Sequence, residues 1–435
     1  MFNKILIANR GEIAVRIIRA CKEMGVSTVA VYSEADRDTL HTELADESIC
    51  IGPPQAQDSY LNAERIVAAA MVTGATAIHP GYGFLSENSD FAELCEKSGI
   101  AFIGPKAQVM RDLSDKALNK AAMKEAGMPV IPGTMKLKDV DDALKKAEEI
   151  GYPVMLKASA GGGGRGIRVI RNEGELKESF ATAGAESLAA FGDDSLYIEK
   201  YVFPARHIEV QVLADEYGNV LCLGERDCSV QRRHQKLIEE SPSPGVTPEM
   251  RKDLMDLCKK AVLHTGYTGA GTLEFLLDKN GNFWFMEMNM RLQVEHGVTE
   301  MLTNLDLVKW QIRIAAGVPI DRKQSEISMR GSCIECRINA LSVGSVKTLH
   351  VPGGPFVRFD TWLVQGVKVS PFYDSLLGKL IVYAGTREEA VRKMRAALCE
   401  MVIEGVETNI EEQLSLISEP EYTSGGYDLT FMEGR

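Results

Sequence analysis

The stretch that decides the fold is 271–293, with the sequence GTLEFLLDKNGNFWFMEMNMRLQ. Thr272–Leu277 is typical of a buried strand. Asp278–Gly281 is turn chemistry, because Asn and Gly tolerate the left-handed backbone that tight turns need. The return strand is predicted over Asn282–Arg291. This stretch therefore predicts an antiparallel hairpin, and its mostly apolar composition indicates that the hairpin is buried.

Two acidic residues of this hairpin form a candidate metal site. Alternation along the return strand places Glu287 and Asn289 on one face. A four-residue turn would pair Glu274 with Phe285, so Glu274 would lie diagonally across from Glu287, with Cβ atoms roughly 7–8 Å apart. A one-residue error in the register would separate the two carboxylates. Mg²⁺ prefers carboxylate oxygens together with substrate phosphates. The alternative is a solvated strand face, but unpaired carboxylates in an apolar hairpin are costly.

Length and composition bound the function classes. A chain of 435 residues suggests roughly three domains of about 150 residues each. The net charge of −12 argues against binding to nucleic acid or to an anionic membrane surface. No apolar run approaches the ~20 residues of a membrane span, and Met1–Ile7 is predicted as a buried strand rather than a secretion signal. The nine scattered cysteines are typical of a reducing compartment, so we expect a cytoplasmic protein.

The amino-terminal segment predicts a parallel, doubly wound sheet. A strand over Lys4–Ile7, a glycine turn, a helix through about Met24 and a strand over Val26–Tyr32 form a βαβ unit. The G-x-G-x-x-G fingerprint is absent, so no dinucleotide site is expected. Further along, Ile78–Asn88 contains the turn formers that hold Tyr82 on a loop.

Two stretches of the middle region suggest anion binding. Gly161–Gly164 follow an apolar strand that carries Lys157, and consecutive glycines let backbone N–H groups approach phosphate oxygens. No Gly-Lys-Ser/Thr opens a helix, so the run is not a Walker A loop, and its spacing fits a hairpin that closes over a nucleotide. Glu225–Lys236 is dense in cationic and amide donors. From its residues alone, this second stretch could equally be an exposed strand and loop or an anion site.

Three helices are predicted from start and stop signals. One begins near Ser114 and ends at Gly127 by the Gly-then-Pro rule, and its Lys124 is an ordinary helix residue rather than a biotin attachment site. A second is predicted over Asn304–Gly317, with a glycine stop, and a third from about Arg387 to Glu400.

The sequence resembles a known family at several of these places. Glu287–His296, EMNMRLQVEH, is similar to the metal and bicarbonate segment of biotin carboxylases, which belong to the ATP-grasp superfamily. The resemblance covers nearly the whole chain and includes Asn9–Ala14, Ile78–Asn88, the glycine run with Lys157, Glu225–Lys236, Ile334–Ala340 and Tyr373–Leu380. The chain departs from the family pattern at Met290, usually Thr, at Gly297, usually Pro, and in a shorter loop after Ala340.

The resemblance implies a fold that combines α/β and α+β parts. It implies a doubly wound parallel amino-terminal domain over residues 1–112. It also implies an ATP-grasp domain over 113–330 with a mobile glycine-rich lid at about 130–203, and a mixed carboxy-terminal domain over 331–435.

The resemblance also implies site residues. For ATP they are Lys116, Lys157, Gly162, Gly163, Gly164, Glu199, Lys200, Val202, His207, Gln231 and His234. For Mg²⁺ or Mn²⁺ they are Glu274, Glu287 and Asn289; for bicarbonate, Lys236, Arg291, Gln293 and Val294; for biotin, Tyr82 and Arg337. Glu295 would be the general base and Arg337 would stabilise the biotin enolate, with Arg291 and Lys236 completing the catalytic set.

The implied activity is ATP-dependent carboxylation of biotin by bicarbonate through carboxyphosphate. The implied partners are a separate biotin carboxyl carrier protein and carboxyltransferase subunits, as in the first half-reaction of acetyl-CoA carboxylase, and a homodimer is expected. Three alternatives remain open at this point: a subunit of a propionyl-CoA or pyruvate carboxylase, another ATP-grasp ligase that joins a carboxylate to an amine, and a degenerate nucleotide-binding regulator.

Overall fold

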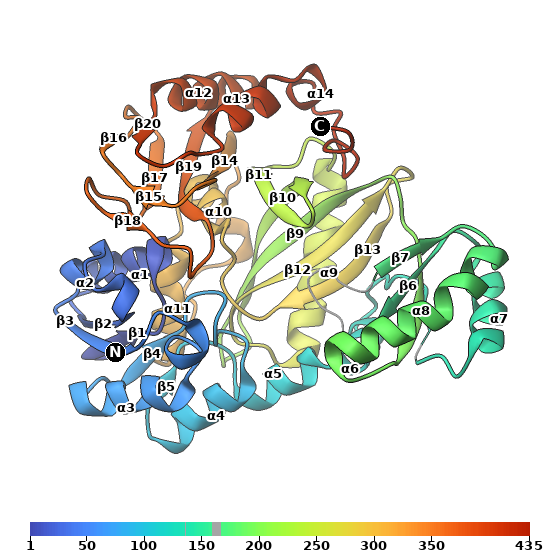
Figure 1. The fold of residues 1–435 in the computed structure, drawn as a ribbon, viewed down its shortest axis with the longest axis horizontal. Helices are drawn as coiled ribbons and strands as arrows, with labels where there is room; N and C mark the ends of the chain where they lie inside the picture. The colour runs from blue at the N-terminus through green and yellow to red at the C-terminus, as the bar shows by residue number, and fades with distance from the viewer. Residues whose placement is uncertain (135, 159–166) are drawn as a thin grey trace.

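The computed structural model describes residues 1–134, 136–158 and 167–435 (Figure 1). The predicted ATP-binding glycines Gly162, Gly163 and Gly164 lie outside the described residues, and the side chain of Lys116 is likewise not described. Figure 1 shows the amino-terminal part below, the carboxy-terminal part above, a large sheet between them and a small unit of β6–β8 with α7 and α8 projecting to one side.

The amino-terminal part is a five-stranded parallel sheet with strand order β3-β2-β1-β4-β5. The strands are β1 Lys4–Ile7, β2 Ser27–Ser33, β3 Glu47–Gly52, β4 Ala77–His79 and β5 Ala101–Phe102. The main helices around it are α1 Gly11–Glu23, α2 Leu40–Leu44, α3 Ala63–Thr73 and α4 Ser89–Lys97. The chain order reverses between β1 and β4, and ligands of such sheets bind at this switch point. The predicted doubly wound sheet is confirmed.

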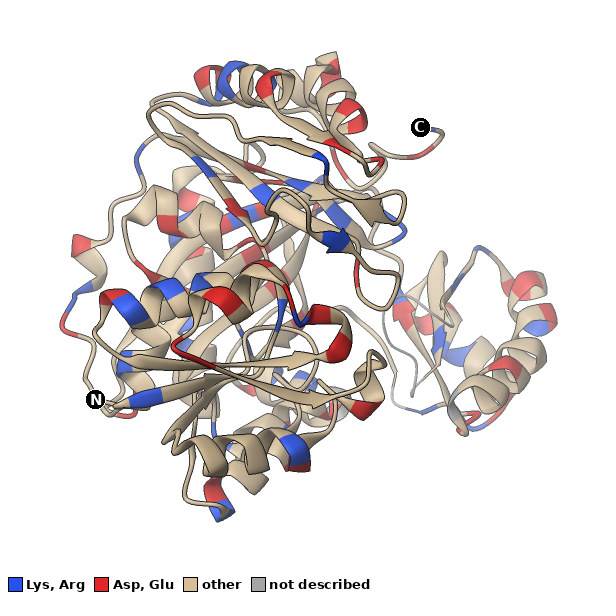
Figure 2. Ribbon diagram, turned by 60° about the vertical axis from the view of Figure 1, so that its left-hand side comes forward, with Lys and Arg blue, Asp and Glu red and all other residues tan. Residues whose placement is uncertain are grey.

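An antiparallel sheet of eight strands forms the centre of the molecule, in the order β13-β12-β9-β10-β11-β14-β19-β17. Its strands are β9 Ala205–Ala214, β10 Val220–Arg232, β11 Gln235–Ser241, β12 Gly269–Asp278, β13 Phe283–Asn289, β14 Ser332–Asn339, β17 Val357–Thr361 and β19 Leu376–Ala384. Because β11 pairs with β14, the sheet runs without a break across the predicted boundary at residue 330. Figure 2 shows acidic and basic residues on strands in the interior as well as on the outer helices.

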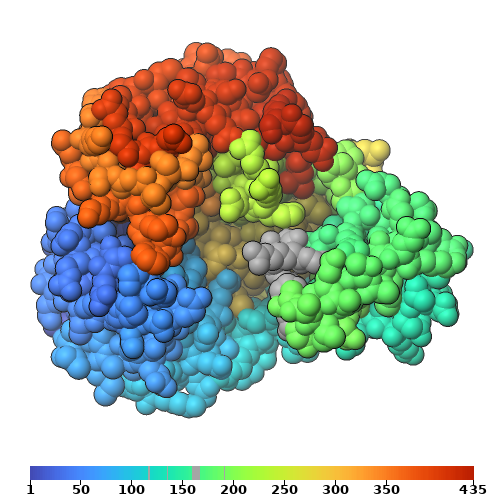
Figure 3. Space-filling model, viewed as in Figure 1, coloured from blue at the N-terminus to red at the C-terminus, as the bar shows by residue number. Residues whose placement is uncertain are grey.

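The region predicted as a lid has its own core. β6 Val154–Ala158 pairs with β7 Ile167–Ile170 and β8 Leu196–Lys200, and α7 Val140–Ile150 and α8 Glu173–Phe191 pack with this sheet. Figure 3 shows the molecular surface hollowed between this unit and the amino-terminal part, with atoms of the central sheet at its floor. Movement of the unit stays a prediction.

The central hairpin forms as predicted, but its register differs. Glu274 pairs directly with Glu287 and not with Phe285, which instead pairs with Phe275. A register shift after Glu274 leaves Met286 as an extra residue, and its side chain is 41% exposed. The predicted diagonal arrangement is therefore wrong. The two carboxylates still share one face, because directly opposed residues of an antiparallel pair point to the same side.

The helix predicted over Asn304–Gly317 begins later than expected. Asn304 has a left-handed backbone (φ 56°) and ends α10 His296–Thr303, a helix that was not predicted. α11 Leu307–Ala315 starts after Asp306, whose carboxylate accepts a hydrogen bond from the Lys309 N–H. The three residues between the two helices, 304–306, thus contain the residue that ends α10 and the N-terminal cap of α11.

The other predicted helices are confirmed as α6 Lys116–Glu125 and α12 Arg387–Glu400. The remaining elements are α5 Ala107–Ser114, α9 Pro248–Thr265, α13 Ile410–Ser418, α14 Pro420–Thr423, the short strands β15 Gly344–Ser345, β16 Thr348–His350, β18 Lys368–Val369 and β20 Val402–Glu404, and three 3₁₀ turns at Glu34–Asp36, Ala56–Asp58 and Gln324–Glu326. None of the helices in the described part of the chain has both the length and the apolar character of a membrane span.

Candidate functional site

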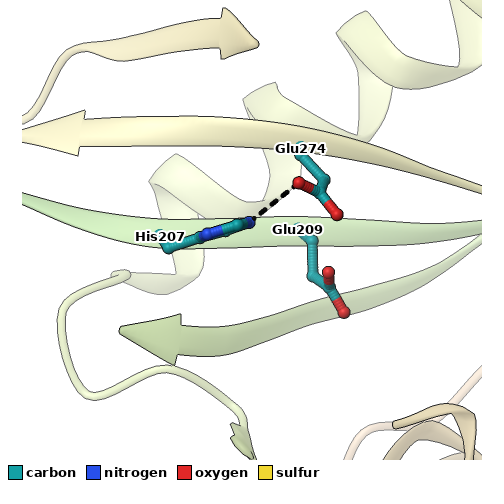
Figure 4. A group of neighbouring side chains, drawn as sticks. All are labelled: His207, Glu209 and Glu274. Carbon is teal, nitrogen blue, oxygen red and sulfur yellow. Dashed lines mark ion pairs between the residues drawn. The ribbon is translucent and has the colours of Figure 1, made fainter. Parts of the chain in front are cut away.

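Several of the predicted site residues converge on one face of the central sheet. Figure 4 shows His207 and Glu209 on β9 beside Glu274 on β12, and the register pairs Glu209 with Glu274. β11 contributes Lys236, and the segment after β13 contributes Arg291 to Glu295. Adjacent strands thus bring together side chains that lie far apart in the sequence.

Lys236 is the central cation of this group. Its Nζ lies 2.6 Å from Glu209 Oε2, 2.6 Å from Glu295 Oε1 and 3.4 Å from Glu274 Oε1. Burial alone would lower the pKa of Lys236, but Cys228 and these carboxylates raise it well above its ordinary value. Burial would likewise raise the pKa values of Glu274 and Glu295, but Lys236 together with His207 for Glu274, and with Arg337 and Arg226 for Glu295, outweighs burial and lowers both. These groups are therefore held ionised.

Glu209 is a site residue that the sequence analysis missed. Its carboxylate is fully buried and pairs with Arg226 at 2.5 Å (Nε to Oε1) as well as with Lys236. The signal was present in the strand His207–Val212, where His207, Glu209 and Gln211 alternate with apolar residues. A buried strand with polar residues at every second position indicates a functional face, since buried charges need partners.

The two candidate metal ligands of the central hairpin, Glu274 and Glu287, carry the carboxylate oxygens that Mg²⁺ prefers. Glu274 Oε1 accepts hydrogen bonds from Asn289 Nδ2 at 2.8 Å and Gln293 Nε2 at 3.0 Å. The Asn289 oxygen accepts from Arg291 Nη2 at 3.0 Å, so this amide would have to turn to bind a cation. Glu274 and its cross-strand partner Glu287 fit Mg²⁺ or Mn²⁺, because hard cations prefer carboxylate oxygens.

His207 and Gln231, both predicted to bind ATP, contact each other, and His207 also contacts Glu274. Gln231 Nε2 donates to the Cys228 carbonyl at 2.8 Å and lies 2.7 Å from His207 Nδ1. Nδ1 is therefore the acceptor, and the proton on Nε2 faces Glu274 Oε2, 3.1 Å away. The arrangement orients Glu274, and the contact of either residue with ATP stays a prediction.

A residue of the amino-terminal part holds the predicted bicarbonate segment. Glu87 accepts from Arg291 Nε at 2.9 Å and from the Met290 N–H at 2.9 Å. Arg291 Nη1 also donates to Gln293 Oε1 at 2.7 Å. The side chain of Met290 packs in the main hydrophobic core, so this departure from the family pattern changes the core rather than the polar face. Glu87 lies within the Ile78–Asn88 match, and its role could not be predicted from the sequence.

The predicted base and the predicted enolate-stabilising arginine share a contact. Arg337 Nη2 donates to Glu295 Oε2 at 2.8 Å, and its Nε donates to Glu239 Oε1 at 2.6 Å. Burial raises the pKa of Glu239 to about 7, even though Arg337 opposes the shift. Glu239, like Glu209, was not predicted.

Tyr82, which was predicted to bind biotin, lies at the switch point of the amino-terminal sheet; the predicted biotin wall is Tyr82 with its partner Glu12. Asn9 Nδ2 donates to the carbonyls of Pro80 and Tyr82, both at 2.7 Å, and so fixes the loop after β4. The Tyr82 hydroxyl donates to Glu12. A cavity of about 130 Å³ opens here, lined by Asn9, Arg10, Gly11, Glu12, Ile13, Tyr82, Gly83, Phe84, Asp374 and Leu376.

Part of the predicted ATP site contains an ion-pair cluster. Glu199 pairs with Lys157 at 2.5 Å and with Lys120 at 3.1 Å, so two lysines already contact a carboxylate that was predicted to bind ATP. The Lys200 N–H donates to the Pro132 carbonyl at 2.8 Å and is therefore not available to ATP. Val202 packs beside a small apolar cluster that includes Ile131, Ala205 and Leu276.

His234 lies on the tight turn between β10 and β11. Arg232 pairs with Gln235, so Arg233 and His234 form a two-residue turn, with φ of 51° and 65°. Such turns favour Asn and Gly, and non-glycine residues with positive φ cluster at functional sites. The turn holds His234 exposed, two residues before the half-buried Lys236.

Three family models match the chain in sequence order. They are the biotin carboxylase N-terminal domain over residues 1–110, the carbamoyl-phosphate synthase L chain ATP-binding domain over 115–323 and the biotin carboxylase C-terminal domain over 335–434. A biotin carboxylase of Haemophilus influenzae is 54% identical, covering 100% of this chain and 98% of the relative.

Solved structures agree with these matches. The biotin carboxylase of Campylobacter jejuni in complex with β,γ-ATP superimposes with a TM-score of 0.96 at 48% identity, covering 99% of this chain and 98% of the other. The biotin carboxylase domain dimer of Hydrogenobacter thermophilus 2-oxoglutarate carboxylase, in complex with MgADP, ADP and bicarbonate, has a TM-score of 0.94 at 51% identity and covers 100% and 97%. The chain belongs to the biotin carboxylase family and is an ATP-dependent ligase of the ATP-grasp superfamily.

Proposed function

We propose that this chain carboxylates biotin borne on a separate biotin carboxyl carrier protein, with bicarbonate and ATP as the other substrates. The observation that carries the proposal is the Lys236 cluster. One half-buried cation contacts both Glu295, the predicted base, and Glu274, the predicted metal ligand. The groups for phosphate activation and for proton removal are therefore within a few ångströms of one another.

Bicarbonate fits beside this cluster. Arg291, Lys236, Gln293 and the Val294 N–H supply cationic and polar donors for its oxygens, and the ionised Glu295 accepts its proton. A bicarbonate oxygen then attacks the γ-phosphorus of ATP, ADP leaves, and carboxyphosphate forms. The chain contributes positioning and charge neutralisation rather than a covalent nucleophile.

Metal ions fit at Glu274 and Glu287, where they would neutralise the triphosphate charge. Lys157, Glu199, the backbone carbonyl of Lys200 and the backbone of Val202 would hold the nucleotide, together with Lys116 and His234. Closure of the small unit of β6–β8, α7 and α8 would cover the nucleotide. Excluding water in this way strengthens each electrostatic contact in the site.

Biotin would bind at the Tyr82 cavity, next to Arg337. Carboxyphosphate gives CO₂ and phosphate there, the phosphate removes the biotin N1 proton, and the Arg337 guanidinium stabilises the enolate oxygen. A positioned cationic donor aimed at developing negative charge is the usual source of such stabilisation.

For the pathway, we propose the first half-reaction of acetyl-CoA carboxylase, with carboxyltransferase subunits as partners. The biotin carboxylase of Haemophilus influenzae, of which this chain covers 98%, supports this assignment. A keto-acid carboxylase is the second candidate, favoured by the 51% identity to the 2-oxoglutarate carboxylase domain. That relative's dimer supports a homodimer, and nine free thiols support a reducing cytoplasm.

The test of the activity is ADP release by the purified chain. We expect release that depends on bicarbonate and rises with free biotin, together with incorporation of ¹⁴C from bicarbonate into biotin. ADP release that needs a carboxylate and an amine instead would favour a different ligase. Nucleotide binding without any turnover would favour a regulator.

The pathway is tested with a carboxylated carrier protein. Transfer of ¹⁴C to acetyl-CoA, propionyl-CoA, pyruvate or 2-oxoglutarate is measured with the carboxyltransferase of each class. Transfer only to a keto acid would overturn the acetyl-CoA assignment and leave biotin carboxylation intact. Sedimentation equilibrium tests the homodimer.

A further inference from the structure

Lys379 is a fully buried lysine that the proposed reaction does not use. It lies on β19 and its side chain is 0% exposed. Its Nζ donates to the Val294 carbonyl at 2.7 Å and lies 3.1 Å from Glu12 Oε1. A buried ammonium is costly unless it is paired and hydrogen-bonded, so these contacts account for its presence.

The sheet register places Lys379 beside Arg337. The two residues are direct cross-strand partners of β19 and β14, and they point to the same side. Arg337 donates to Glu295 and Lys379 donates to the carbonyl of the preceding residue, Val294. Two neighbouring cations thus hold two consecutive residues of the segment that carries the predicted base.

Lys379 also connects this segment to the predicted biotin cavity. Glu12, its second partner, accepts a hydrogen bond from Tyr82, and both line that cavity. The Lys379 ammonium, which extends from β19, therefore contacts both helix α1 of the amino-terminal part and the segment after β13. On the other side of Lys379, Asp360 is its cross-strand partner on β17, with Oδ2 4.0 Å from Nζ.

We propose that Lys379 is a positioning residue, which holds the Val294–Glu295 peptide and the Glu12–Tyr82 pair in one fixed relation. The expected effect of Lys379 on the rate rests on the proposed function, whereas its positioning role rests on geometry alone. Through Val294 it orients Glu295 toward bicarbonate, and through Glu12 it holds the biotin wall at a set distance from that base. A misplacement of about 1 Å in such a site can cost about 10² in rate.

Three variants separate a positioning role from a role in folding. The single change Lys379→Met is not one of them, because it leaves Glu12 buried without its cationic partner. The double variant Lys379→Met with Glu12→Gln removes both charges. Glu12→Gln alone keeps the contact with Val294. Lys393→Met is the matched control, because Lys393 also donates to a backbone carbonyl, that of Tyr383 at 2.7 Å, but at the far end of β19.

The first measurement is hydrogen–deuterium exchange of the peptide covering residues 290–300. We expect about 10-fold or faster exchange in the folded double variant, since a hydrogen bond from a charged donor is lost. Glu12→Gln and Lys393→Met should exchange there as the wild type does. Unchanged exchange in the double variant would overturn the positioning role, whether or not the protein is a biotin carboxylase.

The second measurement is kinetic. We expect the double variant to lose about 10² in kcat for bicarbonate-dependent ADP release, with the KM for MgATP within about twofold of wild type. A matching loss in Lys393→Met, or an increase in KM for MgATP alone, would mean that Lys379 serves general stability. A wild-type protein without bicarbonate-dependent release would refute the proposed function, and the exchange measurement would still decide the positioning role.

Discussion

Arg337 donates a hydrogen bond to Glu295, with 2.8 Å between Nη2 and Oε2. The two residues are assigned to different half-reactions, Glu295 to bicarbonate and Arg337 to biotin, yet one contact couples them. Lys236 holds the other oxygen of the same carboxylate at 2.6 Å. The base is therefore fixed from two sides, and removing one cation leaves the other in place.

The first prediction uses this asymmetry. Arg337→Ala should lose about 10²–10³ in carboxybiotin formation, because a donor to the enolate is gone. Bicarbonate-dependent ATP cleavage without biotin should fall far less, since Lys236 still holds Glu295. Glu295→Gln should lose both activities, because bicarbonate keeps its proton. The paired measurement is ADP release without biotin and ¹⁴C fixed to free biotin.

The control for Arg337 is Arg387→Ala. Arg387 pairs with Glu240, the neighbour of Glu239 on β11, at 2.7 Å between Nε and Oε2, and it lies on α12 away from the predicted site. We expect this variant to lose stability but to keep both activities. Equal losses of both activities in Arg337→Ala would show that Arg337 holds bicarbonate or the fold instead.

The second prediction concerns the metal pair. Glu274→Ala and Glu287→Ala should each abolish turnover at ordinary Mg²⁺, because the triphosphate charge is then poorly neutralised. ADP release as a function of Mg²⁺ concentration is the measurement, with the exposed Glu96→Ala as control. A near-normal rate in either hairpin variant would place the metal elsewhere.

The third prediction is a pH dependence of stability. The pKa of Glu239 in the folded chain is raised from 4.5 to about 7. A raised folded pKa stabilises the protein below the unfolded pKa, and this contribution is lost as pH rises through the folded value. Glu239→Gln lacks this titration. Its free energy of unfolding relative to wild type should therefore increase between about pH 5 and 8, by at most about 3 kcal/mol, and its Tm relative to wild type should increase with it. Parallel Tm curves would contradict the shift.

The fourth prediction is that the chain itself carries no biotin. Lys124, which follows Met123 in a pattern that superficially resembles an attachment site, lies in helix α6. Attachment enzymes would need it on an exposed turn. Streptavidin blotting of protein co-expressed with a biotin ligase should be blank, while a separate carrier protein in the same cells is labelled. A labelled band that Lys124→Arg abolishes would refute this expectation.

The sequence by itself determined the local elements and the chemistry they carry. Alternation and turn residues are local signals, so the hairpin over 271–293, the βαβ start and the helices over Lys116–Glu125 and Arg387–Glu400 could be predicted. The motif around Glu287–His296 and its matches elsewhere also identified the family. The domain bounds and the assigned roles of the site residues stay predictions.

Only the tertiary structure decided how these elements meet. The bulge at Met286 depends on how β13 fits β12, and it replaced a diagonal pairing with the direct opposition of Glu274 and Glu287. Glu209, Glu239 and Lys379 could be assigned to the site only through partners on distant strands. The physical reason is that a buried charge must find its partner in space, and sequence spacing does not record which strands become neighbours.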